Sequence, residues 1–235
     1  MQLNATLWFW VGLAGMTAGT LLGGYRFLVD EENRDLSAVL VGITGIAAVA
    51  YLAMALGYGE ATVAGTEFEI VRYIDWLLTT PLMVLYLGLL ARTERRVLAA
   101  LIGVDAVVIA AGVAATVTDG TVSYAAFGLG ALAYLVLVGL LVRTLPRRAS
   151  FESTRVAGAF TTLRNLTVVV WTLYPVVWLL APTGIGLLLP DTQVLVLTYL
   201  DLVSKVGFVA IAVRAMAVVA DVDADVETEL TSSAD

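Results

Sequence analysis

The most unusual ionisable residue in this chain is Lys205, the only lysine in a sequence that also holds twelve arginines. Lys205 lies inside a long apolar segment, and Asp201 precedes it by four residues, which places both side chains on one face of a helix. Loss of hydration favours the neutral, nucleophilic form of an amine, so a buried lysine is able to form a Schiff base with a carbonyl compound. The alternative is a buried ion pair that only fixes helix packing.

A second pair of charges, Arg72 and Asp75, lies one helical turn apart in another apolar segment. A protonated Schiff base at Lys205 requires nearby carboxylates, and Asp75 and Asp201 are the candidates. Arg72 would then balance the charge of the group. Ionisable residues at membrane depth usually mark function, so we interpret these four residues as one site.

Aromatic residues accompany these charges. Trp76 follows Asp75 directly, and Trp171, Tyr174 and Trp178 are spaced by three and four residues, which puts them on one helical face. Such a stripe is common in helix cores and in the aromatic belts of membrane proteins. Together with a lysine at membrane depth, it indicates a wall around a large apolar group.

The composition defines the elements that must position this site. Of the 235 residues, 60% are hydrophobic and 14% are charged, whereas soluble domains carry about a quarter charged residues. This excludes an ordinary cytosolic enzyme, and it supplies roughly seven bilayer crossings. The absence of histidine and cysteine excludes disulfides, thiol chemistry, an imidazole base and a Cys/His metal site. We therefore expect neither an enzyme nor a metal centre.

Seven apolar segments are long enough to cross a bilayer, and they predict an all-α membrane protein, a bundle of seven transmembrane helices. Lys205 lies about 12 residues into the last segment, roughly 18 Å from its start and near the middle of the membrane. The segments are about Leu3 to Leu28, Leu36 to Tyr58, Ile70 to Ala91, Val97 to Val117, Val122 to Val142, Val156 to Leu180, and Gln193 to Val219.

The arginines predict the orientation of the bundle. All arginines except Arg72 and Arg164 flank alternate ends of the segments. The connections at the opposite ends contain acidic residues but no basic residue. By the positive-inside rule the N-terminus is extracellular and the C-terminus cytoplasmic. We expect residues 1–219 to form the membrane domain and residues 220–235 an acidic, disordered cytoplasmic tail. The net charge of −7 argues against nucleic-acid binding and suits a halophilic cell.

Gly15, Gly19 and Gly23 recur at every fourth residue of the first segment. A stripe of small residues lets another helix approach closely. Packing within the bundle is the interpretation we favour, and a homo-oligomer contact is the alternative.

Three sequence stretches carry a resemblance to a known family. They are residues 72–81 (RYIDWLLTTP), residues 164–178 (RNLTVVVWTLYPVVW) and residues 199–208 (YLDLVSKVGF). In these motifs the chain resembles the microbial (type 1) rhodopsins of the haloarchaeal type, over residues 3–219.

This resemblance implies a cofactor and its site. Lys205 would carry all-trans retinal as a protonated Schiff base, with Asp75 as counterion and primary proton acceptor, Asp201 as second counterion and Arg72 completing the cluster. The matching pocket residues are Trp76, Thr79, Thr80, Met83, Trp171, Tyr174, Pro175 and Trp178, with Phe127, Gly130, Tyr51 and Ser204 nearby. The resemblance also leads us to expect a hydrogen bond between Asp105 and Thr80.

The resemblance also helps to distinguish a proton pump from a sensory receptor. Outward proton pumps of the family carry a carboxylate eleven residues after the counterion, where this chain has Tyr86, a poor proton donor at neutral pH. The glutamates that pumps use for proton release are replaced by Thr183 and Gln193. The resemblance therefore implies slow reprotonation and a slow photocycle.

A slow cycle suits signalling, and the last two segments are most similar to the sensory rhodopsin II group of phototaxis receptors for blue to green light. In that group a hydroxyl next to the lysine, here Ser204, contacts the pocket tyrosine, here Tyr174. Tyr199 would face away from the pocket, either toward lipid or toward a two-helix transducer of the methyl-accepting type. At another interface position the chain has Leu189, where one relative has threonine.

The sequence is compatible with several alternatives. The chain could be a light-driven outward proton pump of low efficiency, or a sensory-like pigment without a standard transducer. A chloride pump is disfavoured because Asp75 occupies the place of the anion. In each case we expect a multi-pass protein of the cell membrane in contact with lipid.

Overall fold

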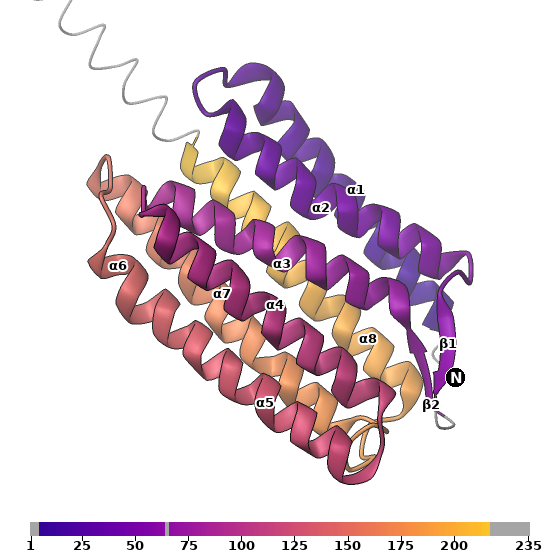
Figure 1. Ribbon diagram of the computed structural model, residues 1–235. Helices are drawn as coiled ribbons and strands as arrows, with labels where there is room; N and C mark the ends of the chain where they lie inside the picture. The colour runs from indigo at the N-terminus through magenta and orange to yellow at the C-terminus, as the bar shows by residue number, and fades with distance from the viewer. Residues whose placement is uncertain (1–4, 64–65, 217–235) are drawn as a thin grey trace, which may run out of the picture.

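The computed structural model describes residues 5–63 and 66–216, which form a bundle of long helices (Figure 1). Within these ranges seven helical segments are long and apolar enough to cross a membrane, as predicted. The first four are α1 (Ala5–Val29), α2 (Arg34–Ala55), α3 (Ile70–Leu90) and α4 (Arg95–Val117). The fifth joins α5 (Gly120–Gly139), the π-helical η1 (Leu140–Thr144) and α6 (Leu145–Arg147), the sixth is α7 (Thr154–Leu180), and the seventh is α8 (Pro190–Asp201), continued by the π-helical η2 (Leu202–Gly207) and a further helical stretch to Met216.

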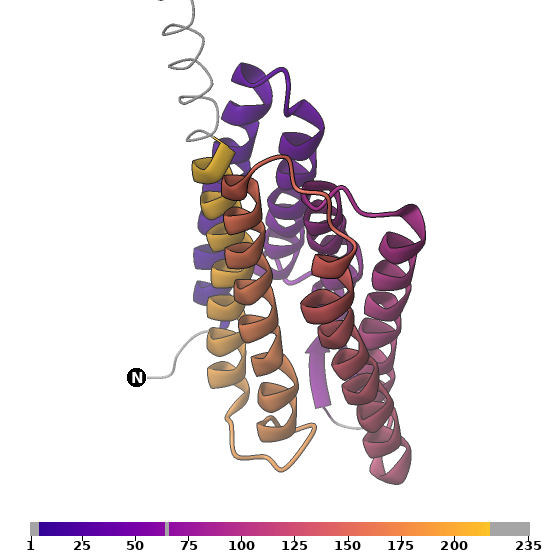
Figure 2. The ribbon, with the colours of Figure 1, turned by 90° about the vertical axis from the view of Figure 1, so that its left-hand side faces the viewer.

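The two ends of the described chain lie at opposite ends of the bundle (Figures 1 and 2). We call the end with Met216 and the α1–α2, α3–α4 and α6–α7 connections the arginine-rich end, and the other the hairpin end. This arrangement agrees with an odd number of crossings. That the arginine-rich end is cytoplasmic remains a prediction, and residues 220–235, the expected acidic tail, lie outside the described residues.

The connection between α2 and α3 contains a β-hairpin that the sequence analysis did not anticipate. Strands β1 (Glu60–Val63) and β2 (Thr66–Glu69) pair antiparallel, with Glu60 opposite Glu69. Helix α2 ends before them because Gly57 and Gly59 adopt φ values of 77° and 78°, which side chains disfavour. The helix ends at Ala55, a few residues before Tyr58, the approximate end expected for the second segment.

The glycine stripe of α1 packs inside the bundle. A Cβ atom would lie 2.3 Å from the Leu202 side chain at Gly15 and 2.8 Å from that of Thr44 at Gly19. At Gly12, on the same helix, a Cβ would lie 2.2 Å from the Tyr51 ring. The favoured interpretation of the stripe, close packing between helices of one chain, is confirmed, and a homo-oligomer remains a separate prediction.

Lys205 lies within η2, where the backbone departs from regular α-helix. Such π-helical turns are rare and occur frequently at functional sites. The apolar pattern of the last segment predicted one uniform helix. Spacing rules based on 3.6 residues per turn are therefore only approximate beyond Leu202.

Candidate functional site

The lysine and the two carboxylates meet in the interior of the bundle. Lys205 Nζ donates a hydrogen bond to Asp75 Oδ2, and Asp201 Oδ1 lies 3.8 Å from the same nitrogen. Each of the three residues has at most 1% of its surface exposed. Helix α3 supplies Asp75, while Asp201 and Lys205 come from the last membrane segment. The cluster predicted from separate segments is therefore assembled by the fold.

Asp201 is the more completely bonded of the two carboxylates. Its Oδ2 accepts hydrogen bonds from Tyr51 Oη at 2.7 Å and Arg72 Nη1 at 3.1 Å. Its Oδ1 accepts from Trp76 Nε1 at 3.0 Å and Tyr174 Oη at 2.8 Å. Four donors stabilise the ionised carboxylate and occupy the lone pairs that a proton would need.

Asp75 is bonded very differently. Its Oδ2 is paired with Lys205, and its Oδ1 accepts no hydrogen bond from the described residues. Asp75 Oδ1 therefore has a lone pair that can accept a proton, whereas the lone pairs of Asp201 are occupied by four hydrogen bonds. Of the two carboxylates, Asp75 is therefore the one with an oxygen that accepts no hydrogen bond from the described residues.

Arg72 closes the charge balance of the cluster. Its side chain is only 2% exposed, and its guanidinium lies over the rings of Phe9 and Tyr51, 5.7 Å and 5.5 Å from their centroids. On the side of the hairpin end, Glu69 Oε2 lies 3.8 Å from Arg72 Nε. The two positive charges of Arg72 and Lys205 balance the two negative charges of Asp75 and Asp201 in the interior. A buried group of this kind costs far less desolvation free energy than an unpaired charge.

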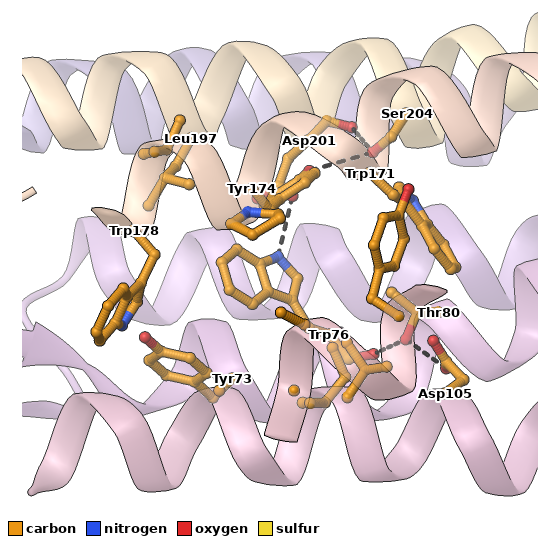
Figure 3. A pocket seen from close by; sticks show the side chains of 18 of the residues that line it. Tyr73, Trp76, Thr80, Asp105, Trp171, Tyr174, Trp178, Leu197, Asp201 and Ser204 are labelled. Atoms are coloured by element: carbon orange, nitrogen blue, oxygen red, sulfur yellow. Dashed lines mark hydrogen bonds between the residues drawn. The ribbon is translucent and has the colours of Figure 1, made fainter. Parts of the chain in front are cut away.

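An aromatic cavity that includes Lys205 is lined by residues of α3, α4, α5, α7 and the last membrane segment. Figure 3 shows its aromatic side chains. The rings of Trp76 and Tyr174 meet edge to face, with centroids 5.1 Å apart. Toward the hairpin end, Trp178 stacks on Phe127 at 4.4 Å. The further lining residues are Tyr73, Thr80, Met83, Asp105, Val108, Ile109, Gly112, Gly130, Ala131, Tyr134, Trp171, Pro175, Val177, Gln193, Leu197, Asp201, Ser204 and Lys205.

Most residues predicted for the pocket line this cavity. They are Trp76, Thr80, Met83, Phe127, Gly130, Trp171, Tyr174, Pro175, Trp178, Ser204 and Lys205. Thr79 is not among the lining residues, and its hydroxyl donates a hydrogen bond to the Asp75 backbone carbonyl at 2.7 Å. Tyr199 lies away from the cavity, 63% exposed on the surface of α8.

Two predicted side-chain contacts are also present. Thr80 Oγ1 donates to Asp105 Oδ2 at 2.8 Å, which confirms the expected pair. The Tyr174 and Ser204 hydroxyls are 3.4 Å apart, so this contact is long, and Ser204 also donates to the Asp201 carbonyl at 3.2 Å. The Tyr174 hydroxyl is held chiefly by Asp201.

Other parts of the cavity wall were missed in the sequence analysis. Tyr73 lies three residues before Trp76 and shares its helical face, so the aromatic spacing could have revealed it. Val108, Gly112 and Ala131, by contrast, are small apolar residues in helices that are apolar throughout. No spacing rule distinguishes their cavity-facing side from their lipid-facing side.

The cavity fits the predicted cofactor, retinal. It is lined mainly by aromatic and aliphatic side chains, as a polyene and its ring require, and it includes the amine of Lys205. Asp75 and Asp201 lie beside that amine to compensate a positive charge on it. The side chains present thus supply an attachment point, its counter-charges and an apolar enclosure.

Comparisons with known proteins agree with this geometry. The family model for bacteriorhodopsin-like proteins matches residues 4–219. Sensory rhodopsin-2 of Natronomonas pharaonis is 45% identical over 92% of this chain and 91% of its own length. Sensory rhodopsin-2 of Halobacterium salinarum is 48% identical over 88% of this chain and 87% of its own length. The crystal structure of thermophilic rhodopsin from Rubrobacter xylanophilus superposes with a TM-score of 0.86, at 38% identity, over 90% of this chain and 96% of that one. The chain therefore belongs to the bacteriorhodopsin-like family of microbial rhodopsins, as a retinal-binding protein of the cell membrane with seven transmembrane helices and not an enzyme.

Proposed function

We propose that this protein is a photoreceptor for blue to green light, which holds all-trans retinal on Lys205 and signals phototaxis through a membrane transducer. The proposal is supported by relatives named sensory rhodopsin-2 that cover about nine tenths of the chain. It is supported independently by the distribution of buried carboxylates along the bundle.

Lys205 would hold the cofactor covalently, and Trp76, Trp171, Phe127 and Trp178 would form aromatic walls of the cavity that encloses it. Bound retinal supplies visible-light absorption and a light-driven change of shape. The chain supplies the electrostatics. Asp75 receives the proton that Lys205 Nζ releases, because Asp75 Oδ1 is free of other donors whereas Asp201 already accepts four hydrogen bonds.

One observation carries the choice of a receptor over a pump. Among the described residues the fully buried carboxylates are Asp75, Asp105 and Asp201, and all three belong to the cavity or its charged cluster. Toward the arginine-rich end the core of the described residues consists mainly of apolar side chains and contains no buried carboxylate, and Tyr86 and Phe208 are in edge-to-face contact there at 5.4 Å. Apolar side chains such as Leu87, Phe160 and Val213 fill the remainder.

An apolar interior without a carboxyl offers no internal acid to return a proton to Lys205. Reprotonation must then wait for water or an external acid to reach the nitrogen. The deprotonated form persists, and a partner has time to respond to it. An efficient pump needs the opposite, a positioned proton donor on this side of the lysine.

The transducer contact would lie on the outer surface of α8. Tyr199 is 63% exposed there. A partner with two transmembrane helices, of the methyl-accepting type, could accept a hydrogen bond from Tyr199 in an environment without competing water. Leu189, 72% exposed, offers only apolar contact at the start of the same helix.

Flash photolysis of the pigment in vesicles, with and without the candidate transducer, tests the proposal. We expect a slowly recovering state, little light-driven change of pH across the membrane, and a response to the transducer that Tyr199→Phe weakens. Fast recovery with sustained outward proton transport would establish the pump. A slow cycle unaffected by any transducer would indicate a sensory-like pigment without a standard partner.

A further inference from the structure

The Thr116 hydroxyl joins three helices at the hairpin end of the aromatic cavity. Thr116 lies in the last turn of α4, Tyr73 in the first turn of α3, and Trp178 in the last turn of α7. Trp178 Nε1 donates to Thr116 Oγ1 at 3.2 Å, and the Tyr73 hydroxyl lies 2.8 Å from the same oxygen. Thr116 is 6% exposed.

The protons of this junction can be assigned from its geometry. Thr116 Oγ1 donates its one proton to the Gly112 carbonyl at 3.0 Å. The Tyr73 hydroxyl must therefore donate to Thr116, as does the indole N–H of Trp178. A hydroxyl has one proton and two lone pairs, so Thr116 is fully used. Replacing it by an apolar residue would leave two aromatic donors without their acceptor.

The junction separates two hollow regions of the protein. Tyr73 and Trp178 line the aromatic cavity around Lys205. Thr116 itself lines a small polar pocket at the hairpin end, together with Thr118, Asp119, Ser123, Tyr124 and Thr183. Figure 3 shows Tyr73 and Trp178 close to each other on one side of the aromatic cavity.

The surrounding contacts keep this wall in place. Trp178 is stacked on Phe127 at 4.4 Å and meets Tyr124 edge to face at 6.3 Å. Ser123 Oγ donates to the Ala115 carbonyl at 2.6 Å, which ties the start of α5 to the end of α4. The one polar contact that fixes the rotation of the Trp178 ring among the described residues is its bond to Thr116.

We propose that Thr116 is a positioning residue, which holds Trp178 and Tyr73 as a closed partition between the polar hairpin-end pocket and the aromatic cavity. The partition keeps water and small polar nucleophiles away from the bond at Lys205. The inference rests on the proposed binding of retinal there, but the hydrogen bonds of the partition exist without it. Its failure and that of the proposed function can therefore be told apart.

The first measurement uses the protein before retinal is added. Hydrogen exchange of the Trp178 indole N–H, followed by ¹⁵N NMR and assigned with Trp178→Phe, should become about tenfold faster in Thr116→Val, the factor expected from one lost buried hydrogen bond. Thr116→Ser, which keeps the hydroxyl, should restore slow exchange. Thr44→Val is the matched control, because Thr44 is buried and its hydroxyl only donates to the Leu40 carbonyl of its own helix.

The second measurement uses the pigment. Bleaching by hydroxylamine in the dark should be about tenfold faster in Thr116→Val than in the wild type, and close to wild type in Thr116→Ser and Thr44→Val. Tyr73→Phe, which removes one donor and no acceptor, should give a smaller acceleration and serves if Thr116→Val does not fold. Fast indole exchange with unchanged bleaching would overturn the partition, and unchanged exchange would overturn the hydrogen-bond assignment. A wild-type chain that forms no pigment would contradict the proposed function, while indole exchange would still decide the role of Thr116.

Discussion

The Tyr51 hydroxyl donates a 2.7 Å hydrogen bond to Asp201, although 150 residues separate the two in the chain. Tyr51 is fully buried on α2, and its ring lies between α1 and the guanidinium of Arg72. The ring fits against α1 because Gly12 has no side chain. The position of Asp201 therefore depends on packing between α1 and α2, two helices that contribute no charge to the cluster.

Gly12→Ala should disturb the cluster from a distance. The added Cβ would lie 2.2 Å from two atoms of the Tyr51 ring, so the ring must shift and its bond to Asp201 must lengthen. We expect a loss of about 1–3 kcal/mol in stability from overpacking and a shift of the visible band. Thermal unfolding and absorption spectra measure both.

Gly24→Ala provides the matched control for that change. No atom lies within 4 Å of its added Cβ, on the same helix. Alanine should be neutral or stabilising there by up to about 1 kcal/mol, because it is the better helix former. Equal effects of the two substitutions would argue against a specific contact at Gly12.

Lys205→Ala should abolish the visible absorption band, since the sequence offers no other lysine to hold the cofactor. It also leaves Asp75 and Asp201 opposite Arg72 alone, which should destabilise the fold by about 3–5 kcal/mol. Lys205→Arg separates these effects, because it keeps the charge but not the reactive amine. Retention of a visible band in either variant would contradict the assignment of Lys205.

Asp75→Asn should move the visible band to longer wavelength, because a positive charge on Lys205 Nζ loses its nearest counter-charge. It should also remove the carboxyl that is protonated after illumination, a change seen by infrared difference spectroscopy. Asp201→Asn should instead disturb assembly of the pigment, since four donors would lose an ionised acceptor. A light-induced carboxyl signal that survives in Asp75→Asn would assign the acceptor to another residue.

Tyr86→Asp should accelerate recovery of the pigment after a flash. A carboxyl in the apolar half of the bundle supplies the missing internal acid, and a positioned proton donor is worth about a hundredfold or more in rate. Tyr86→Phe controls for loss of the phenol and should recover as slowly as the wild type. Azide, an external proton donor, should accelerate the wild type and Tyr86→Phe but add little to Tyr86→Asp. Rapid recovery of the wild type without azide would remove the argument for a sensor.

The sequence alone was sufficient to predict seven membrane helices and the residues of the charged cluster. Apolar runs of about 20 residues have few stable arrangements other than membrane helices. Charges such as Lys205 and Asp75 stand out because burying them in such runs is costly unless they are paired. Helix geometry alone predicts that Asp201 and Lys205 share one face, and that the aromatic residues of α7 share another.

Other features were decided by tertiary structure. Which carboxylate is free to accept a proton depends on Tyr51, Arg72, Trp76 and Tyr174, which reach Asp201 from three different helices. The junction at Thr116 likewise joins side chains from three helices that lie far apart in the chain. Periodicity reports one helix at a time, and in a bundle that is apolar both inside and outside it does not say which face meets which partner.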